Sequence, residues 1–195
     1  MDDARKCVIA AAASVLLPLT SIVVASLASG WFNPLNNALS DLGHATRSQV
    51  APIFNWGLST GGLAIALISF TCFRKYRLLL AAGIVTGYSL LLVAVFDEIY
   101  GHLHFIVSVA FFLSLAFTLT AYAATFRTLT PLPALAISIA AWILHLGYGI
   151  PRGAAIPELV SIILCLPFYL HAAATYPRVE ERADKARSAE RHYRL

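Results

Sequence analysis

Ionisable side chains lie beside or within long apolar stretches of this chain at three places. The first is the polar stretch from Trp31 to Gln49, the second runs from Phe96 to His104, and the third is Glu158 near the start of the last apolar stretch. Carboxylates and imidazoles are the groups that acid–base catalysis and metal binding use. Inside a membrane such groups are costly, and their presence there indicates a function.

The second place holds two carboxylates, Asp97 and Glu98, and two imidazoles, His102 and His104, within eight residues. Zinc is the candidate metal, with Asp97, His102 and His104 as its candidate ligands. Histidines two positions apart point about 200° from each other on a regular helix, so both reach one metal only if His102 lies in the turn. The alternative is that the carboxylates mark an exposed turn and the imidazoles form ordinary hydrogen bonds.

The first place has helical periodicity. On an α-helix, four polar side chains would share one face: Asn37, Ser40, Asp41 and His44. Three leucines would share the opposite face: Leu35, Leu39 and Leu42. The pattern predicts a short amphipathic helix at the outer interface of the membrane, with its leucines in lipid or on top of the bundle. Asn33 before Pro34 would help to start this helix, because proline is tolerated in a first turn.

Membrane-spanning helices are the elements that position these groups. Of the 195 residues, 59% are hydrophobic and 12% are charged, whereas soluble domains average about 25% charged residues. A span needs about 20 mostly apolar residues. Six stretches qualify: Val8 to Ser29, Val50 to Phe73, Leu78 to Phe96, His102 to Phe126, Pro131 to Gly149 and Ile156 to Tyr176. We therefore predict an all-α bundle of six transmembrane helices over residues 1–176. The first is expected to be retained, because its apolar run exceeds the core of a signal peptide.

Basic residues decide the predicted orientation. With six spans, twelve of the fourteen lysines and arginines fall on one side of the membrane, and only Arg47 and Arg152 fall on the other. The positive-inside rule then places both termini in the cytoplasm. Residues 177–195 form a tail of mixed charge, and the predicted location is the cell (plasma) membrane, crossed several times. Because the basic residues cluster by side and form no nucleic-acid motif, no nucleic-acid partner is expected.

Further polar residues fall near the outer ends of the predicted spans. They are Asn55, Ser108, His145, Tyr148 and Glu158. Each alone is explained as a side chain that forms a hydrogen bond between helices. Together with the two polar stretches they predict a pocket near the extracytoplasmic face.

The three cysteines, Cys7, Cys72 and Cys165, are far apart in the sequence. Each lies within or at the end of an apolar stretch, and none belongs to a C-x-x-C pair. We therefore expect small buried thiols without a metal or redox role.

Several short motifs resemble those of one family. They are Asn33-Pro34, Leu39-Ser40-Asp41-Leu42-Gly43, Pro52 with Phe54-Asn55, His104 to Ser108 with Phe111-Phe112, and Ala155-Ile156-Pro157-Glu158. Over nearly the whole chain they resemble the prokaryotic membrane proteins grouped as domain of unknown function 998, which are similar in outline to the Frag1/DRAM/Sfk1 membrane proteins. The resemblance implies six helices and a membrane location but no established reaction. The site residues that it implies are Asn33, Ser40, Asp41, Gly43, Asn55, His104 and Glu158.

Two hypotheses for the function concern lipids. In the first, the bundle binds a membrane lipid, or serves as a component of a complex with other membrane subunits, through its outer polar pocket. In the second, it is a hydrolase or transferase that acts on a lipid substrate at the outer interface. There Asp41 or Glu158 would be the general base, His104 the acid or a zinc ligand, and Asn55 or Ser40 a polarising donor.

A third hypothesis is transport or electron transfer. His104 and His145 would then act as a proton relay or as haem ligands on facing helices. Two suitable histidines are a thin basis, and haem is not expected. The sequence alone leaves open whether the ligand is a sterol, a phospholipid, an isoprenoid or a peptide.

Overall fold

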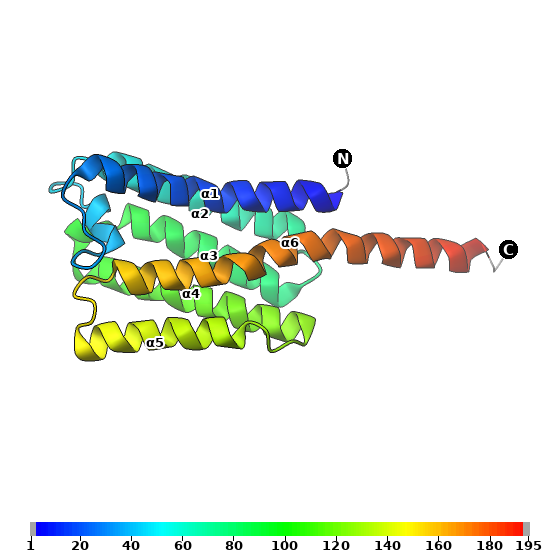
Figure 1. Cartoon of the computed structure of the whole chain (residues 1–195). Coiled ribbons are helices and arrows are strands. Elements are labelled where there is room, and N and C mark those ends of the chain that lie inside the picture. The colour runs from blue at the N-terminus through cyan, green and yellow to red at the C-terminus, as the bar shows by residue number, and fades with distance from the viewer. Residues whose placement is uncertain (1–2, 193–195) are drawn as a thin grey trace.

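The structure, a computed structural model, describes residues 3–192. This part of the chain folds as six α-helices (Figure 1). They are α1 (Asp3–Ser29), α2 (Ala51–Cys72), α3 (Arg77–Val95), α4 (His102–Phe126), α5 (Leu132–Tyr148) and α6 (Ala155–His192). Two 3-10 helices, η1 (Leu39–Gly43) and η2 (Glu98–Tyr100), precede α2 and α4. Every predicted stretch lies on one of these helices, so the predicted all-α fold is confirmed.

Five of the helices, α1, α2, α3, α4 and α6, are long and apolar enough to cross a membrane. The apolar helix α5 has 17 residues and is about 25 Å long, slightly less than a hydrocarbon layer of about 30 Å. The protein is therefore a helical membrane protein, and a sixth span formed by α5 stays a prediction. The helix α6 continues past the bundle into the predicted tail (Figure 1).

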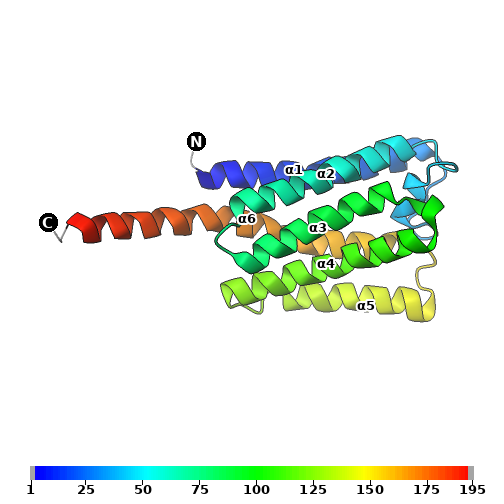
Figure 2. The same ribbon diagram turned by 180° about the vertical axis from the view of Figure 1, so that it is seen from behind.

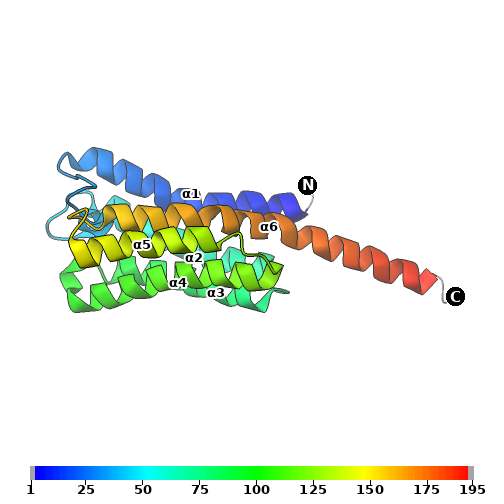
Figure 3. The same ribbon diagram turned by 60° about the horizontal axis from the view of Figure 1, so that its bottom comes forward.

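The five long helices form a ring, and α5 lies outside it. Helix α2 packs on α1 and α3, α3 packs on α4, and α6 closes the ring by packing on α4 and α1. Helix α5 contacts only α6 and α4 extensively, as two further views show (Figures 2 and 3). Among its own residues only Ala134 and Ser138 are buried. The middle of the molecule is therefore enclosed by the five long helices.

Glycines bring α2 and α3 close together within the ring. A Cβ atom at Gly62 would lie 2.5 Å from the carbonyl oxygen of Gly87. A Cβ atom at Gly87 would lie 2.6 Å from the backbone nitrogen of Ala66. Neither position can take a larger residue unless the helices separate. Close contact between small residues is a main source of helix association in membranes, where apolar surface gains little by leaving lipid.

The connection between α1 and α2 folds over one end of the ring. We call residues 33–44 the cap, and the end that they cover the capped end. The predicted short helix in this segment is the 3-10 helix η1, which has five residues. The sequence predicts that the leucines lie either in lipid or on top of the bundle. Leu39 and Leu42 are buried on top of the bundle, whereas 57% of Leu35 is exposed.

Backbone hydrogen bonds explain why the cap contains no longer helix. The carbonyl oxygen of Leu35 accepts a hydrogen bond from the backbone nitrogen of Gly153 at 2.9 Å. The carbonyl oxygen of Asn37 accepts one from the backbone nitrogen of Ala155 at 3.0 Å. Both donors belong to the α5–α6 region. Because these carbonyls bind a distant part of the chain, they are not used by an α-helix within the cap.

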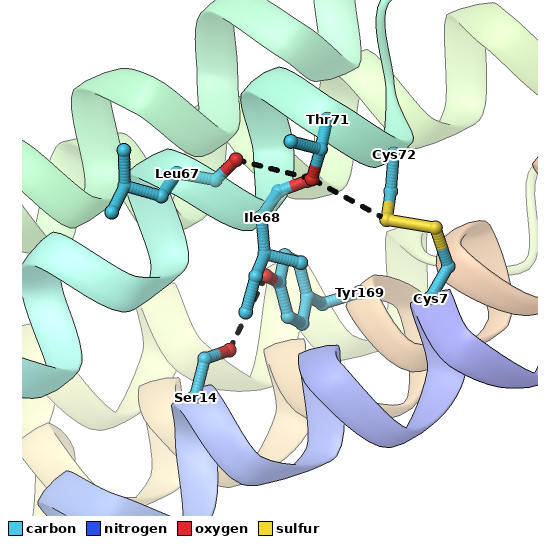
Figure 4. The surroundings of a disulfide bond; sticks show 7 residues. All are labelled: Cys7, Ser14, Leu67, Ile68, Thr71, Cys72 and Tyr169. Carbon is cyan, nitrogen blue, oxygen red and sulfur yellow. Dashed lines mark hydrogen bonds between the residues drawn. A yellow bond between two sulfur atoms is a disulfide. The ribbon is translucent and has the colours of Figure 1, made fainter.

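Two cysteines are joined, contrary to the expectation of three separate thiols. Cys7 near the start of α1 and Cys72 at the end of α2 form a disulfide (Figure 4), with 5.9 Å between their Cα atoms. The sequence gave no sign of this pairing, because the two residues are 65 positions apart and only the packing of α1 on α2 brings them together. Cys165 is a buried free thiol, as expected.

The disulfide lies at the end of the bundle opposite the cap, where α1 begins and α2 ends. The charge bias predicts that this end faces the cytoplasm, where thiols are normally kept reduced. Only 3% of Cys72 is exposed. Burial of this kind restricts the access that thiol–disulfide exchange requires. Cys7, however, is only half-buried, so a reductant can still reach the bond. The disulfide therefore does not support the predicted orientation, which stays a prediction.

We expect the Cys7–Cys72 bond to stabilise the purified protein. A cross-link over 65 residues restricts the unfolded chain, an effect worth up to about 4 kcal/mol in the chain-entropy account. Cys7→Ser should lower the Tm in detergent, and a reductant should lower the Tm of the wild type but not that of the variant. The control is a Cys165→Ser variant, which should still respond to the reductant. Equal Tm values for the wild type and Cys7→Ser would contradict the expectation.

Candidate functional site

Two carboxylates hold the cap in place. Asp41 accepts hydrogen bonds from the side-chain nitrogen of Asn37 and from the backbone nitrogen of Ala38, both at 2.9 Å. Glu158, in the first turn of α6, accepts one from the backbone nitrogen of Leu39 at 2.7 Å. These bonds use donors that an irregular segment would otherwise leave unpaired, and an unpaired buried donor is costly.

Glu98 of η2 is the third carboxylate at the capped end. The Ser40 hydroxyl donates a hydrogen bond to it at 2.8 Å. Burial raises the pKa of the Glu98 carboxyl above its usual value; the bond from Ser40 acts against this rise, and the negative charge of Asp41 adds to it. The nearby His104 lowers the pKa of Glu98. Three carboxylates from the cap, η2 and α6 thus meet around Ser40.

His104 links the turn before α4 to the interior. Its Nδ1 lies 2.7 Å from the carbonyl oxygen of Phe96. A carbonyl only accepts, so Nδ1 carries the proton, and in the neutral ring Nε2 is left as an acceptor. The Ser108 hydroxyl lies 3.3 Å from Nε2 and is placed to donate to it. The two partners therefore fix both the orientation and the tautomer of the imidazole.

A narrow cavity of about 100 Å³ lies inside the ring of five helices. Most of its lining is apolar, and side chains of α1, α2, α3, α4 and α6 contribute to it. At the capped end its polar lining is Ser40, Ser108 and Glu158, and Tyr169 lies at its far end. Glu158 and Tyr169 are both on α6, so the cavity extends along roughly 16 Å of helix.

A second, open pocket of about 480 Å³ lies on the surface of the capped end. We call it the mouth. Its lining is mainly polar and comes from the end of the cap and the residues that follow it, from η2 and from the start of α4. The lining residues are His44, Thr46, Arg47, Glu98, Ile99, Gly101 and His104.

Two side-chain hydrogen bonds join residues that line the cavity to residues that line the mouth. One joins Ser40, which lines the cavity, to Glu98, which lines the mouth. The other joins Ser108 of the cavity to His104 of the mouth. We call these two bonds the partition. Each pairs a hydroxyl group on the apolar side with an ionisable group on the polar side.

The structure thus brings together Ser40, Asp41, His104, Ser108 and Glu158, which the sequence placed among the candidates. Other candidates are elsewhere. On α5, His145 contacts the carbonyl oxygen of Pro151 at 2.9 Å, and 72% of Tyr148 is exposed. Neither of these α5 residues lines the cavity or the mouth.

The remaining predicted binding residues support the cap. The Asn33 side-chain oxygen accepts a hydrogen bond from the backbone nitrogen of Leu35 at 2.9 Å. Asn55 of α2 donates one to the carbonyl oxygen of Gly43 at 2.8 Å. His44 lies in the mouth. Asn33 and Asn55 therefore position the cap and line neither pocket.

The three candidate zinc ligands point to different partners. Asp97 accepts a hydrogen bond from the backbone nitrogen of Ile99 at 2.8 Å. His102 stacks on the ring of Phe105, and His104 faces inward as described above. Within residues 3–192, no group of three histidine, cysteine, aspartate or glutamate side chains is arranged to hold a metal ion.

Sequence reasoning missed two sets of residues. Arg47 and Thr46 of the mouth follow the predicted helix and belong to no motif. Their one signal in the sequence was that Arg47 is a basic residue on a side of the membrane predicted to hold few of them. Thr86 of α3 and Thr118 of α4 line the cavity and lie 3.1 Å apart through their hydroxyl oxygens. Single hydroxyls in apolar stretches carry no pattern that predicts which helices they join.

A ring of apolar helices with one capped end and an internal cavity defines the class of this protein as a helical membrane bundle. The chain belongs to the family described as Protein of unknown function (DUF998), whose model matches residues 11–175. The match covers the cap, the cavity and the mouth. No curated protein and no solved structure matches the chain. The likeness to Frag1/DRAM/Sfk1 proteins and a prokaryotic origin stay predictions.

We expect Glu98 to make the stability of the protein depend on pH. Because folding raises its pKa above 4.5, the folded protein keeps this proton at pH values where the unfolded chain has lost it. Its contribution is therefore greatest at low pH and is lost as the pH rises through the raised pKa. Ser40, Asp41, His104 and Glu158 face this group.

The measurement is the difference in Tm between Glu98→Gln and the wild type from pH 5 to pH 8. The neutral amide still accepts from Ser40 and does not repel the other carboxylates, so this difference should shift in favour of the variant as the pH rises. Comparing the two proteins cancels the contribution of the histidines that do not interact with Glu98. A difference that stays constant across the range would contradict the assignment.

Proposed function

We propose that the protein binds an amphiphilic lipid, with its polar end in the mouth and part of a hydrocarbon chain in the cavity. One observation carries this proposal. An apolar cavity inside the bundle and a polar pocket at its capped end adjoin at the partition, where two side-chain hydrogen bonds join residues that line one to residues that line the other. Ligand sites generally combine an apolar lining with a few placed polar groups.

The dimensions support a linear chain. The mouth, at about 480 Å³, is within the usual range for ligand pockets of about 300–1,000 Å³. The cavity is smaller, at about 100 Å³, and an apolar cavity of about 150 Å³ accommodates benzene. A cavity of this volume fits a segment of an unbranched chain and is too small for a fused-ring sterol. A longer segment requires the partition to open.

Filling the cavity should prevent binding. Val93 of α3 lines the cavity and is 8% exposed, whereas Val95 on the same helix is 51% exposed. Val93→Phe should lower retention of palmitoyl lysophosphatidylethanolamine, measured by native mass spectrometry of the purified protein. Excluding two methylene groups from an apolar site costs about 1.6 kcal/mol, or roughly a tenfold loss of affinity.

Val95→Phe is the matched control, and it should retain the lipid like the wild type. The Tm of each variant shows whether it is folded. Equal retention by folded Val93→Phe and Val95→Phe would overturn the proposal. Binding of lipid to a part of the outer surface away from Val95 would give that result, because neither substitution would affect it.

Hydrolysis of an ester in the bound amphiphile is a second candidate function, and the Ser108–His104 pair favours it. The unprotonated Nε2 of His104 is placed to accept the Ser108 proton, which is the arrangement of an activated serine nucleophile. Ser108 lies where the polar end of the lipid would meet its chain. Asp41 and Glu158 bind backbone nitrogens of the cap and are less suited to the role of base.

The steps of this reaction follow from that pair. The Ser108 oxygen would attack the ester carbonyl carbon while its proton passes to His104. The alcohol would leave with this proton. Water would then hydrolyse the acyl-serine, releasing a carboxylic acid and restoring the serine.

A long-chain alkyl fluorophosphonate tests this second function, because it reacts with activated serines. We expect one adduct, mapped to Ser108 by peptide mass spectrometry and absent from His104→Gln. Ser114→Ala, which removes another serine of α4, should label like the wild type. If Ser108 of the wild type is labelled no faster than that of His104→Gln, the serine is not activated and the second function is excluded.

A further inference from the structure

The mouth holds charges of both signs that do not neutralise each other. Arg47 and Glu98 both line it. Among the described residues, the Arg47 guanidinium has no ion pair and no hydrogen bond to another side chain, and Glu98 has no cationic partner within 4.0 Å. A cation and a carboxylate that share a pocket of about 480 Å³ form a fixed pair of opposite charges.

We propose that the mouth recognises a zwitterionic headgroup made of a phosphate ester and a primary amine, as in phosphoethanolamine. This inference rests on the proposed function and adds the class of headgroup. The phosphate would bind Arg47, because guanidinium groups donate paired hydrogen bonds to phosphate oxygens. The ammonium group would bind Glu98. An anionic headgroup would leave Glu98 facing a like charge or no partner. A cationic headgroup would do the same to Arg47.

The lining also favours a primary amine over a quaternary one. Quaternary ammonium groups are typically bound by aromatic cages. No phenylalanine, tyrosine or tryptophan is among the lining residues of the mouth. A primary ammonium group instead carries three N–H donors. The Glu98 carboxylate and the Thr46 hydroxyl are acceptors in the same pocket, so directional hydrogen bonds can form there.

Binding of an ammonium group would also compensate for the partial burial of the Glu98 carboxylate near the charge of Asp41. The Glu98 carboxyl has a raised pKa because it is partly buried near Asp41. A cation beside it would favour the ionised form. The Ser40 hydroxyl donates a hydrogen bond to Glu98, and the nearby His104 favours its ionised form. An ammonium group in the mouth would add to these two effects.

Three lysophospholipids with the same palmitoyl chain test the inference: those with ethanolamine, choline and glycerol headgroups. Each is titrated against the full-length protein in detergent, and the bound fraction is measured by native mass spectrometry. We expect the ethanolamine lipid to bind about two- to fivefold more tightly than the other two, the range of a partly exposed charge pair.

Single substitutions test separately whether Arg47 binds the phosphate and whether Glu98 binds the ammonium group. Arg47→Gln should weaken binding of all three lipids, because all carry the phosphate. Glu98→Gln should remove the preference for ethanolamine over glycerol and leave binding of the glycerol lipid unchanged or stronger. Arg152→Gln is the matched control, since this exposed arginine of the α5–α6 connection does not line the mouth. It should leave all three affinities unchanged.

The outcomes separate this inference from the proposed function. Equal binding of the three lipids, with all of it lost in Val93→Phe, would overturn the headgroup inference and leave lipid binding intact. Preference for the choline or the glycerol lipid would also overturn it. Loss of affinity in Arg152→Gln equal to that in Arg47→Gln would show a general charge effect and would count against a built site. Absence of binding by every lipid would overturn the proposed function itself.

Discussion

The hydrogen bond from the Leu39 backbone nitrogen to the Glu158 carboxylate is the interaction on which the capped end depends. At a membrane boundary, irregular backbone is stable only where its polar groups find partners in the protein. The cap is irregular, and Glu158, Asp41 and the α5–α6 connection provide those partners. Once the cap is fixed on α6, Ser40 lies beside Glu98, and the cavity is closed from above.

The two ends of the bundle are held by bonds of different strength. At one end a covalent bond joins α1 to α2. At the other end the partition consists of two hydrogen bonds, each worth roughly 1 kcal/mol net, somewhat more where a charged group takes part. Breaking these two bonds alone costs only a few kcal/mol, and states of this energy are populated at a low level. The bonds of the cap to Glu158, Asn55 and the α5–α6 connection are not broken in such a state. Movement that admits a ligand is expected at the capped end.

The arrangement of helices explains why a cavity exists. Glycines hold α2 against α3, and α5 packs outside the ring and does not fill its centre. Five helices in a ring enclose more space than their side chains fill. The ionisable Glu158 lines this space at the capped end together with Ser40 and Ser108, whereas its polar lining further along consists of hydroxyl groups, those of Thr86, Thr118 and Tyr169. The capped end of the cavity is therefore its more polar end. An amphiphile has the same division, and this correspondence links the fold to the proposed function.

The sequence by itself determined the helices, the membrane location, the family and most members of the polar cluster. Long apolar stretches have one stable form in a bilayer, and ionisable groups in them are conspicuous because they are costly. Tertiary structure alone decided that α5 lies outside the ring and that Cys7 meets Cys72. It also decided that His145 lines neither the cavity nor the mouth and that Arg47 lines the mouth. These facts depend on which helix faces meet. Almost uniformly apolar helices carry little information about their facing sides, because lipid and protein interior are equally apolar.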